Sequence, residues 1–190
     1  MKLKSAILAV SMLAFGAGMA NAGSWSLGLN GGAAMPTGDF GEVASTGWNV
    51  GVNATNQVNE KWGFGADLGY HSWGVSDDME ALLGPGESMS FSAIQGTGFA
   101  VMRFPTSGSA TPYVKFGAGV YNVGAKLESP SGDADNSDSN LGFNFGGGMN
   151  FATQGNMSWG LGGAYHIIQT EGSSTNMFTL GLNVNFGMGQ

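Results

Sequence analysis

Apolar residues recur at every second position over most of the chain after residue 22. This period of two is typical of a β-strand whose two faces meet different surroundings. No helix is required between the alternating stretches, although Met79–Leu83 offers one helical turn inside a loop. The pattern predicts eight strands, at Ser24–Met35, Gly47–Asn56, Lys61–Trp73, Met89–Phe104, Thr111–Leu127, Leu141–Ala152, Met157–Ile168 and Met177–Gly187.

The connections between these stretches alternate in length, as expected when neighbouring strands run up and down. The short connections are Gln57–Glu60, Pro105–Ala110 and Thr153–Asn156. The long connections hold 11 of the 13 acidic residues and are Pro36–Thr46, Gly74–Ser88, Glu128–Asn140 and Gln169–Asn176. One end of the protein is therefore predicted to carry acidic loops, and the other end tight turns.

The two faces of the predicted strands differ in side-chain size and polarity. One face carries large apolar residues, and the other is mainly Gly, Ser, Asn and Thr with few charges. A soluble barrel turns its apolar face inward and coats the outside with charge, whereas a membrane barrel does the reverse. Small polar side chains suit a narrow lumen. Because every backbone group in lipid needs a hydrogen-bond partner, the strands must close into a barrel.

The stretch Met89–Phe104 alternates least clearly, because Phe99 shares a parity with Gln95, Thr97 and Arg103. An arginine on a lipid face is destabilising. We therefore expect these polar side chains inside the barrel.

Aromatic residues on the apolar face fall near the strand ends, where membrane barrels carry girdles of rings. With both termini in the periplasm, the girdle at the short turns comprises Trp25, Trp62, Phe151, Trp159 and Phe186. The girdle at the long loops comprises Trp48, Tyr70, Phe143, Tyr165 and Phe178.

The composition agrees with a membrane barrel. Of the 190 residues, 35 are glycine and only 10% are charged, whereas soluble domains have about 7% glycine and about 25% charged residues. The apolar content of 42% is too high for a disordered chain. The chain has no cysteine, which excludes disulfides, thiolate zinc sites and cysteine nucleophiles.

Residues 1–22 have the three regions of a secretory signal peptide: a basic start, an apolar stretch over Ala6–Met19 and a small-x-small end. We expect cleavage between Ala22 and Gly23, which leaves residues 23–190 as the outer-membrane β-barrel. No later apolar run is long enough for a membrane-spanning helix.

The mature chain is strongly acidic. It keeps four basic residues, Lys61, Arg103, Lys115 and Lys126, against 13 acidic ones. Four basic residues cannot neutralise a run of phosphates. Nucleic acid is therefore excluded as a partner.

A lumen polar cluster is predicted from the ionisable residues on the polar face, which are Asp67, His71, Arg103, Lys115 and His166. A charge in a narrow interior is costly unless it is paired. We therefore expect Asp67, Arg103 and Lys115 to form an ion-pair cluster. Such a cluster either braces the barrel or gates a pore, and bracing is the favoured interpretation.

No catalytic, cofactor-binding or metal site is predicted. His71 is followed by Ser72 on the opposite face and His166 by Ile167, so neither histidine has a nucleophile beside it on the same face. The segment Asp133–Asp138 is rich in oxygen ligands but lacks the glycine and the closing glutamate of an EF-hand. A solvated acidic loop is the better interpretation.

Two local segments carry a family resemblance: Pro36–Phe40, with the sequence PTGDF, and Thr111–Gly119, with the sequence TPYVKFGAG. They are similar to the P-x-G-D-F and P-Y-x-x-x-G-x-G segments of small outer-membrane barrels in Gram-negative bacteria. The mature chain resembles this group of OmpX-like, OmpA-like and opacity-type proteins over its whole length. The resemblance implies an all-β, eight-stranded antiparallel up-and-down transmembrane β-barrel in the outer membrane.

The resemblance also implies partners: outer-membrane lipids and lipopolysaccharide, the outer-membrane assembly machinery, and an extracellular ligand of the loops. The protein is expected to be monomeric. The family usually ends on an aromatic residue that the assembly machinery reads, whereas here Phe186 is followed by four more residues.

Three function classes follow. The first, which we favour, is a structural or surface-interaction barrel that acts through its acidic extracellular loops. The second is a narrow, gated, water-filled channel for small solutes or ions, because many inward positions are glycine. The third, a secreted soluble barrel, is disfavoured by the uncharged polar face.

Overall fold

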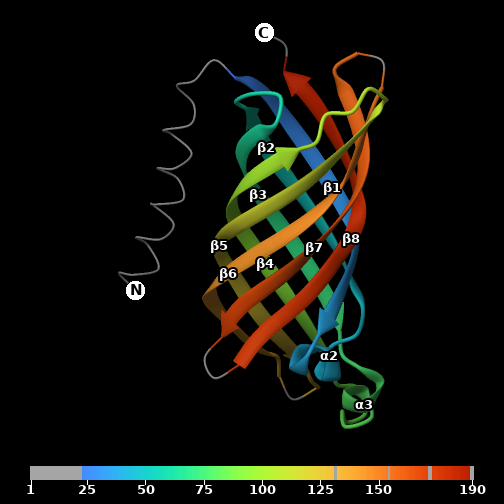
Figure 1. The fold of residues 1–190 in the computed structure, drawn as a ribbon. Coiled ribbons are helices and arrows are strands. Elements are labelled where there is room, and N and C mark those ends of the chain that lie inside the picture. The colour runs from blue at the N-terminus through green and yellow to red at the C-terminus, as the bar shows by residue number, and fades with distance from the viewer. Residues whose placement is uncertain (1–22, 131, 154, 171–172, 189–190) are drawn as a thin grey trace.

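The computed structural model describes residues 23–130, 132–153, 155–170 and 173–188. The predicted signal peptide, including Ala22 of its cleavage site, lies outside these residues. Eight antiparallel strands form one closed barrel in chain order, and β8 pairs with β1 (Figure 1). The strands are β1 Ser24–Thr37, β2 Gly47–Gln57, β3 Trp62–Gly74, β4 Ser88–Arg103, β5 Ala110–Glu128, β6 Ala134–Ala152, β7 Met157–Thr170 and β8 Ser173–Met188. The predicted fold class is confirmed.

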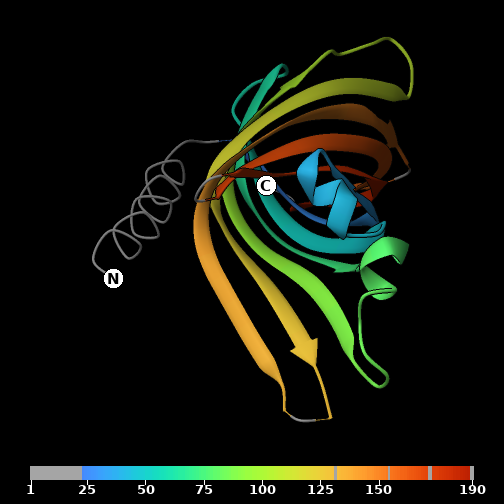
Figure 2. The same ribbon diagram turned by 90° about the horizontal axis from the view of Figure 1, so that it is seen from below.

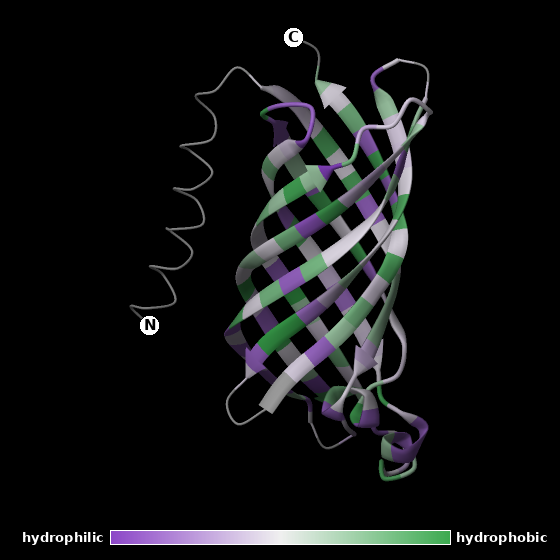
Figure 3. Cartoon of the chain, viewed as in Figure 1, coloured by the Kyte–Doolittle hydropathy of each residue, from purple (hydrophilic) through white to green (hydrophobic). Residues whose placement is uncertain are grey.

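The strands form because their alternation satisfies two environments at once, as the hydropathy colouring along each strand shows (Figure 3). Outward side chains such as Leu68 and Phe116 are 63% and 62% exposed in the isolated chain. Inward ones such as Asp67 and Thr97 are 4% and 2% exposed. This arrangement is inside-out relative to a soluble barrel. Among the described residues, no helix is long and apolar enough to cross a membrane.

The two ends of the barrel differ as the connection lengths predict. The start of β1, the end of β8 and the short turns lie at one end, and α2 and α3 lie at the other (Figure 1). Short turns are typical of the periplasmic side and longer loops of the extracellular side. We therefore call these the periplasmic end and the loop end.

Two short helices lie in the connections at the loop end. The helical turn expected at Met79–Leu83 is present but begins earlier, as α3 at Asp77–Glu80. The helix α2 at Asp39–Val43 was not predicted. Gly38 precedes it with φ +61°, a left-handed conformation that glycine adopts without strain. That turn directs α2 across the opening of the barrel (Figure 2).

Strand β6 corrects the sequence analysis at its start. The predicted loop Glu128–Asn140 is largely strand, because β6 begins at Ala134 and pairs with β5 from Leu127 onward. The acidic segment Asp133–Asp138 is therefore mostly part of a hairpin rather than a loop. This β5–β6 hairpin leans outward beyond the rim of the barrel (Figure 2).

Candidate functional site

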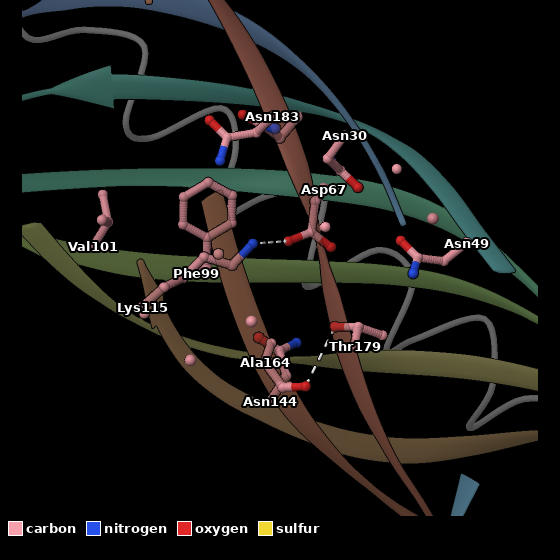
Figure 4. A pocket seen from close by; sticks show the side chains of 18 of the residues that line it. Asn30, Asn49, Asp67, Phe99, Val101, Lys115, Asn144, Ala164, Thr179 and Asn183 are labelled. Atoms are coloured by element: carbon pink, nitrogen blue, oxygen red, sulfur yellow. Dashed lines mark hydrogen bonds and ion pairs between the residues drawn. The ribbon is translucent and has the colours of Figure 1, made fainter. Parts of the chain in front are cut away.

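Asp67 and Lys115 form an ion pair inside the barrel (Figure 4). Lys115 Nζ donates to Asp67 Oδ2 at 2.7 Å, and the same ammonium group lies 4.3 Å from the centroid of the Phe99 ring. The Asp67 side chain is 4% exposed and that of Lys115 is 28% exposed. A carboxylate this deeply buried is tolerable only with such a partner.

Strand β4 completes the environment of the Asp67 carboxylate. Gln95 Nε2 and Thr97 Oγ1 donate to Asp67 Oδ1 at 2.6 and 2.7 Å. Both donors face the lumen, as expected for this strand, and so do Phe99 and Val101, which are buried beside them. The carboxylate therefore accepts three hydrogen bonds, which is strong compensation for its desolvation.

Arg103 is not part of this ion pair. Its Nη1 donates to Gln57 Oε1 at the periplasmic end of the barrel. Asp67 is paired with Thr97 across β3 and β4, and Arg103 lies six residues further along β4, about 20 Å at the rise of a strand. The structure thus brings together two of the three charges expected in the cluster.

The two histidines extend the polar network toward the loop end. His71 Nε2 lies 3.0 Å from Gln95 Oε1, and His166 Nδ1 lies 3.0 Å from the Tyr121 hydroxyl. The two imidazole rings meet edge to face, with centroids 5.6 Å apart. Asn144 Nδ2 donates to Tyr121 Oη at 3.0 Å and lies 3.4 Å from Thr97 Oγ1. One hydrogen-bond network therefore connects the ion pair with both histidines.

An apolar cluster adjoins this network at the loop end of the lumen. Phe40 of α2 packs edge to face against Trp73 and Phe91, with centroid distances of 5.3 and 5.6 Å. The buried members of the cluster are Ala34, Phe40, Ala44, Trp73, Ala93, Tyr121, Ile168 and Met177. These residues come from the strands, from α2 and from Ala44 directly after α2, and they fill this part of the lumen.

Two cavities lie along the rest of the described interior. The first has a volume of about 170 Å³ and is lined by the Asp67 network together with inward asparagines such as Asn30, Asn49 and Asn183 (Figure 4). The second, of about 490 Å³, lies among the strand ends at the periplasmic end. Inward glycines make room for larger inward side chains: a Cβ at Gly162, which lines the first cavity, would overlap the hydroxyl of Tyr113.

The residues predicted as aromatic girdles lie on the outer face of the barrel. Seven of the ten are at least 36% exposed in the isolated chain, and Trp25, Phe151 and Tyr165 are half-buried. Phe151 stacks on Trp159 at 4.5 Å near the short turns, and Trp48 contacts Tyr70 at 5.6 Å near the loops.

A polar extracellular surface lies on the sheet that extends beyond the barrel. β4, β5 and β6 remain paired out to Ser88, Glu128 and Ala134. The pairing of β6 with β7, in contrast, begins only at Gly142. Lys126 lies here, bonded to Glu128 at 2.5 Å, among acidic neighbours. In the described part of the chain it is the one basic residue at the loop end.

Sequence reasoning missed two contributors to the lumen. The sequence presents Phe40 only as part of the PTGDF segment, and the inward parity of Tyr121 within Thr111–Leu127 does not by itself assign it a role. A signal for Phe40 exists: it is a lone aromatic in a polar loop, which often marks a segment that folds back onto the protein.

A closed barrel that presents large apolar side chains outward and keeps its polar network inside is a transmembrane β-barrel. The model of the family described as outer membrane protein beta-barrel domain matches residues 5–186. The chain belongs to this family, and its place is the Gram-negative outer membrane. A search of curated proteins gives no match.

Solved structures give the same fold. Neisserial surface protein A matches with a TM-score of 0.60 and 17% identity, covering 85% of this chain and 96% of its own. Ail of Yersinia pestis, in complex with the heparin analogue sucrose octasulfate, matches with a TM-score of 0.59 and 17% identity over 86% of this chain and 99% of its own. The N-terminal barrel of Pseudomonas aeruginosa OprF has a TM-score of 0.50 and 14% identity over 86% and 97%.

The family consists of small, non-enzymatic barrels of this kind. Among the described residues, no group of three or more His, Cys, Asp or Glu side chains is arranged to hold a metal ion.

Proposed function

We propose that this protein is a surface-interaction barrel whose acidic extracellular end binds a basic, extended segment of a partner protein. The observation that carries the proposal is the β5–β6 hairpin, which leans beyond the barrel rim (Figure 2). The barrel serves as the mount for this hairpin in outer-membrane lipid and lipopolysaccharide. We expect the mount to be a monomer that the outer-membrane assembly machinery inserts.

The edge of β6 supplies the binding mode. Ala134–Ser137 pair with β5 on one side, and the pairing of β6 with β7 starts further along at Gly142. An edge of this kind presents backbone N–H and C=O groups to which an extended chain can add as a further strand. Backbone pairing gives affinity, and the side chains along the edge give selectivity.

The charge of the loop end selects the partner. Asp133, Asp135 and Glu128 lie on the hairpin, and α2 and α3 add further carboxylates. A negative surface attracts a positively charged partner and repels a polyanion. Ail was solved with a sulfated heparin analogue, and the acidic end of the present chain predicts the opposite preference.

A binding assay on the barrel refolded into lipid nanodiscs tests the proposal. The probe is a fluorescent ten-residue peptide that alternates Lys and Val, and its control is a peptide of equal charge in which proline replaces two valines. We expect saturable binding of the first peptide and at least tenfold weaker binding of the second, because proline interrupts strand pairing. Heparin should not bind.

A shortened barrel locates the site. In this variant, Asn-Gly replaces the residues between Gly124 and Ser137, which face each other across the hairpin. The change removes the outer part of the hairpin and leaves the transmembrane pairs intact. This barrel should lose peptide binding while it keeps its heat-modifiable gel mobility. Undiminished binding by the shortened barrel, or equal affinity for heparin, would contradict the proposal.

The channel interpretation is less well supported. The apolar cluster around Phe40 fills the lumen at the loop end, and eight-stranded barrels normally have interiors filled by side chains. Both observations favour a closed lumen in the resting barrel.

A further inference from the structure

The cavity at the periplasmic end has a cation at its inner boundary. Arg103, Asn150 and Asn185 line both this cavity and the smaller one around Asp67. Arg103 therefore lies where the two spaces meet. It is half-buried, at the last residue of β4.

Arg103 carries a charge that no carboxylate balances among the described residues. Its hydrogen-bond partner is the neutral amide of Gln57. Its cross-strand neighbours are Tyr113 on β5 and Lys61, whose carbonyl accepts from the Arg103 backbone N–H. The lumen carboxylate, Asp67, is held by Lys115 instead.

The walls of the cavity suit a small polar ligand. Besides Arg103, its lining residues include Asn150 and Asn185, which carry amides, and Thr111 and Ser158, which carry hydroxyls. A guanidinium has five N–H donors in a planar fork that matches a carboxylate or a phosphate. Among the described residues, Gln57 is the one side chain that accepts a hydrogen bond from this guanidinium, so further N–H groups can bind an oxyanion.

The cavity is accessible from one side of the membrane. Its lining residues come from the periplasmic ends of the strands, while the apolar cluster fills the lumen at the loop end. A ligand would therefore enter from the periplasm.

We propose that the periplasmic mouth of the barrel binds a small oxyanion, a carboxylate or a phosphate, on Arg103 and the surrounding amide and hydroxyl groups. This site is independent of the extracellular hairpin.

The test is an NMR titration of the refolded mature chain in phosphate-free buffer, with inorganic phosphate and acetate added separately at constant ionic strength. We expect saturable shifts of the Arg103 side-chain N–H signals and of the Thr111 and Ser158 amides with at least one of the two anions. The anion that saturates identifies the ligand class. Shifts that grow linearly without saturation for both anions would overturn the proposal.

Charge variants separate the site from general attraction. Arg103→Gln should weaken binding at least tenfold, and Arg103→Lys should retain part of it because the charge remains without the planar fork. Lys126→Gln makes the same charge change at the loop end and should leave the titration unchanged. Equal effects of Arg103→Gln and Lys126→Gln, with both barrels folded by gel mobility, would also overturn the proposal.

Discussion

Two adjoining layers fill the lumen by different chemistry. The layer around Asp67 is polar, and its side chains come from the strands of the barrel wall. The layer around Phe40 is apolar and includes a side chain from a five-residue helix in a connection. The first layer is fixed by strand register, whereas the second depends on a loop that folds back over the opening.

Because the two layers are held in place differently, we expect them to have different roles. A network built on paired strands cannot move without disturbing the sheet, so it braces the barrel. The helix α2 is held by Phe40 and by hydrogen bonds between its C-terminal end and the segment after β3, and these contacts can break while the sheet stays intact. Stability should therefore depend most on the polar layer, and closure of the lumen on the apolar one.

The sharpest test of this comparison is Asp67→Ala. The change leaves Lys115 in the lumen without its counter-charge and takes an acceptor from Gln95 and Thr97. We expect the free energy of unfolding to fall by about 3–5 kcal/mol, as for the breaking of a buried ion pair. The measurement is urea unfolding in lipid vesicles, followed by tryptophan fluorescence. Leu68→Ala, at the next, outward-facing residue, is the control and should cost less.

Phe40→Ala should have a smaller effect on stability and a larger one on closure. Phe40 is 8% exposed and contacts Trp73 and Phe91. We expect a loss of about 3 kcal/mol, the lower end for a buried phenylalanine, because the short helix can relax. In planar bilayers the wild-type barrel should be silent and the variant should show openings.

Leu82→Ala is the matched control for that experiment, since Leu82 lies in another loop and is 79% exposed. It should leave both stability and conductance unchanged. A wild-type barrel that conducts as well as the Phe40 variant would show that the apolar layer does not close the lumen.

Thr97→Val should produce the smallest effect of the three. The change keeps the shape of the side chain but removes the donor to Asp67 Oδ1, at 2.7 Å. Loss of one buried hydrogen bond to a charged group predicts a decrease of about 1–2 kcal/mol in the free energy of unfolding. Urea unfolding of the variant measures it. A loss as large as that of Asp67→Ala would mean that Thr97, rather than Lys115, dominates the polar layer.

The transmembrane part of the fold is predictable because lipid and lumen impose opposite demands on alternate residues. Seven of the eight strands were placed within four residues of their ends. The start of β6 was missed because Ala134–Asn140 stand outside the membrane, where polar residues suit both faces of a sheet. Without alternation, the segment looks like a loop.

The sequence predicts which side of the barrel wall each charged residue faces, but not its position along the barrel axis. Parity alone puts Asp67, Arg103 and Lys115 in the lumen, and the cavity linings place all three there. Whether two inward residues meet depends on the stagger of the strands around the barrel, which a single sequence does not reveal. For the same reason, the hydrogen bonds of Tyr121 and His166 could not be foreseen.

The α2 helix could not be predicted from the sequence for a different reason. Five residues are too few to be helical by propensity, and its position depends on the contact of Phe40 with the barrel. A local sequence window shows Phe40 only as a lone aromatic in a polar loop and does not reveal which barrel residues it contacts.

The tip of the β5–β6 hairpin has a practical consequence. Gly132 has φ +136°, and a Cβ there would meet open space. A foreign epitope inserted between Gly132 and Asp133 would be carried on two paired strands, clear of the barrel rim, where an antibody could reach it on an intact cell. The same projection that suits the hairpin to partner binding would make this protein a scaffold for peptide display.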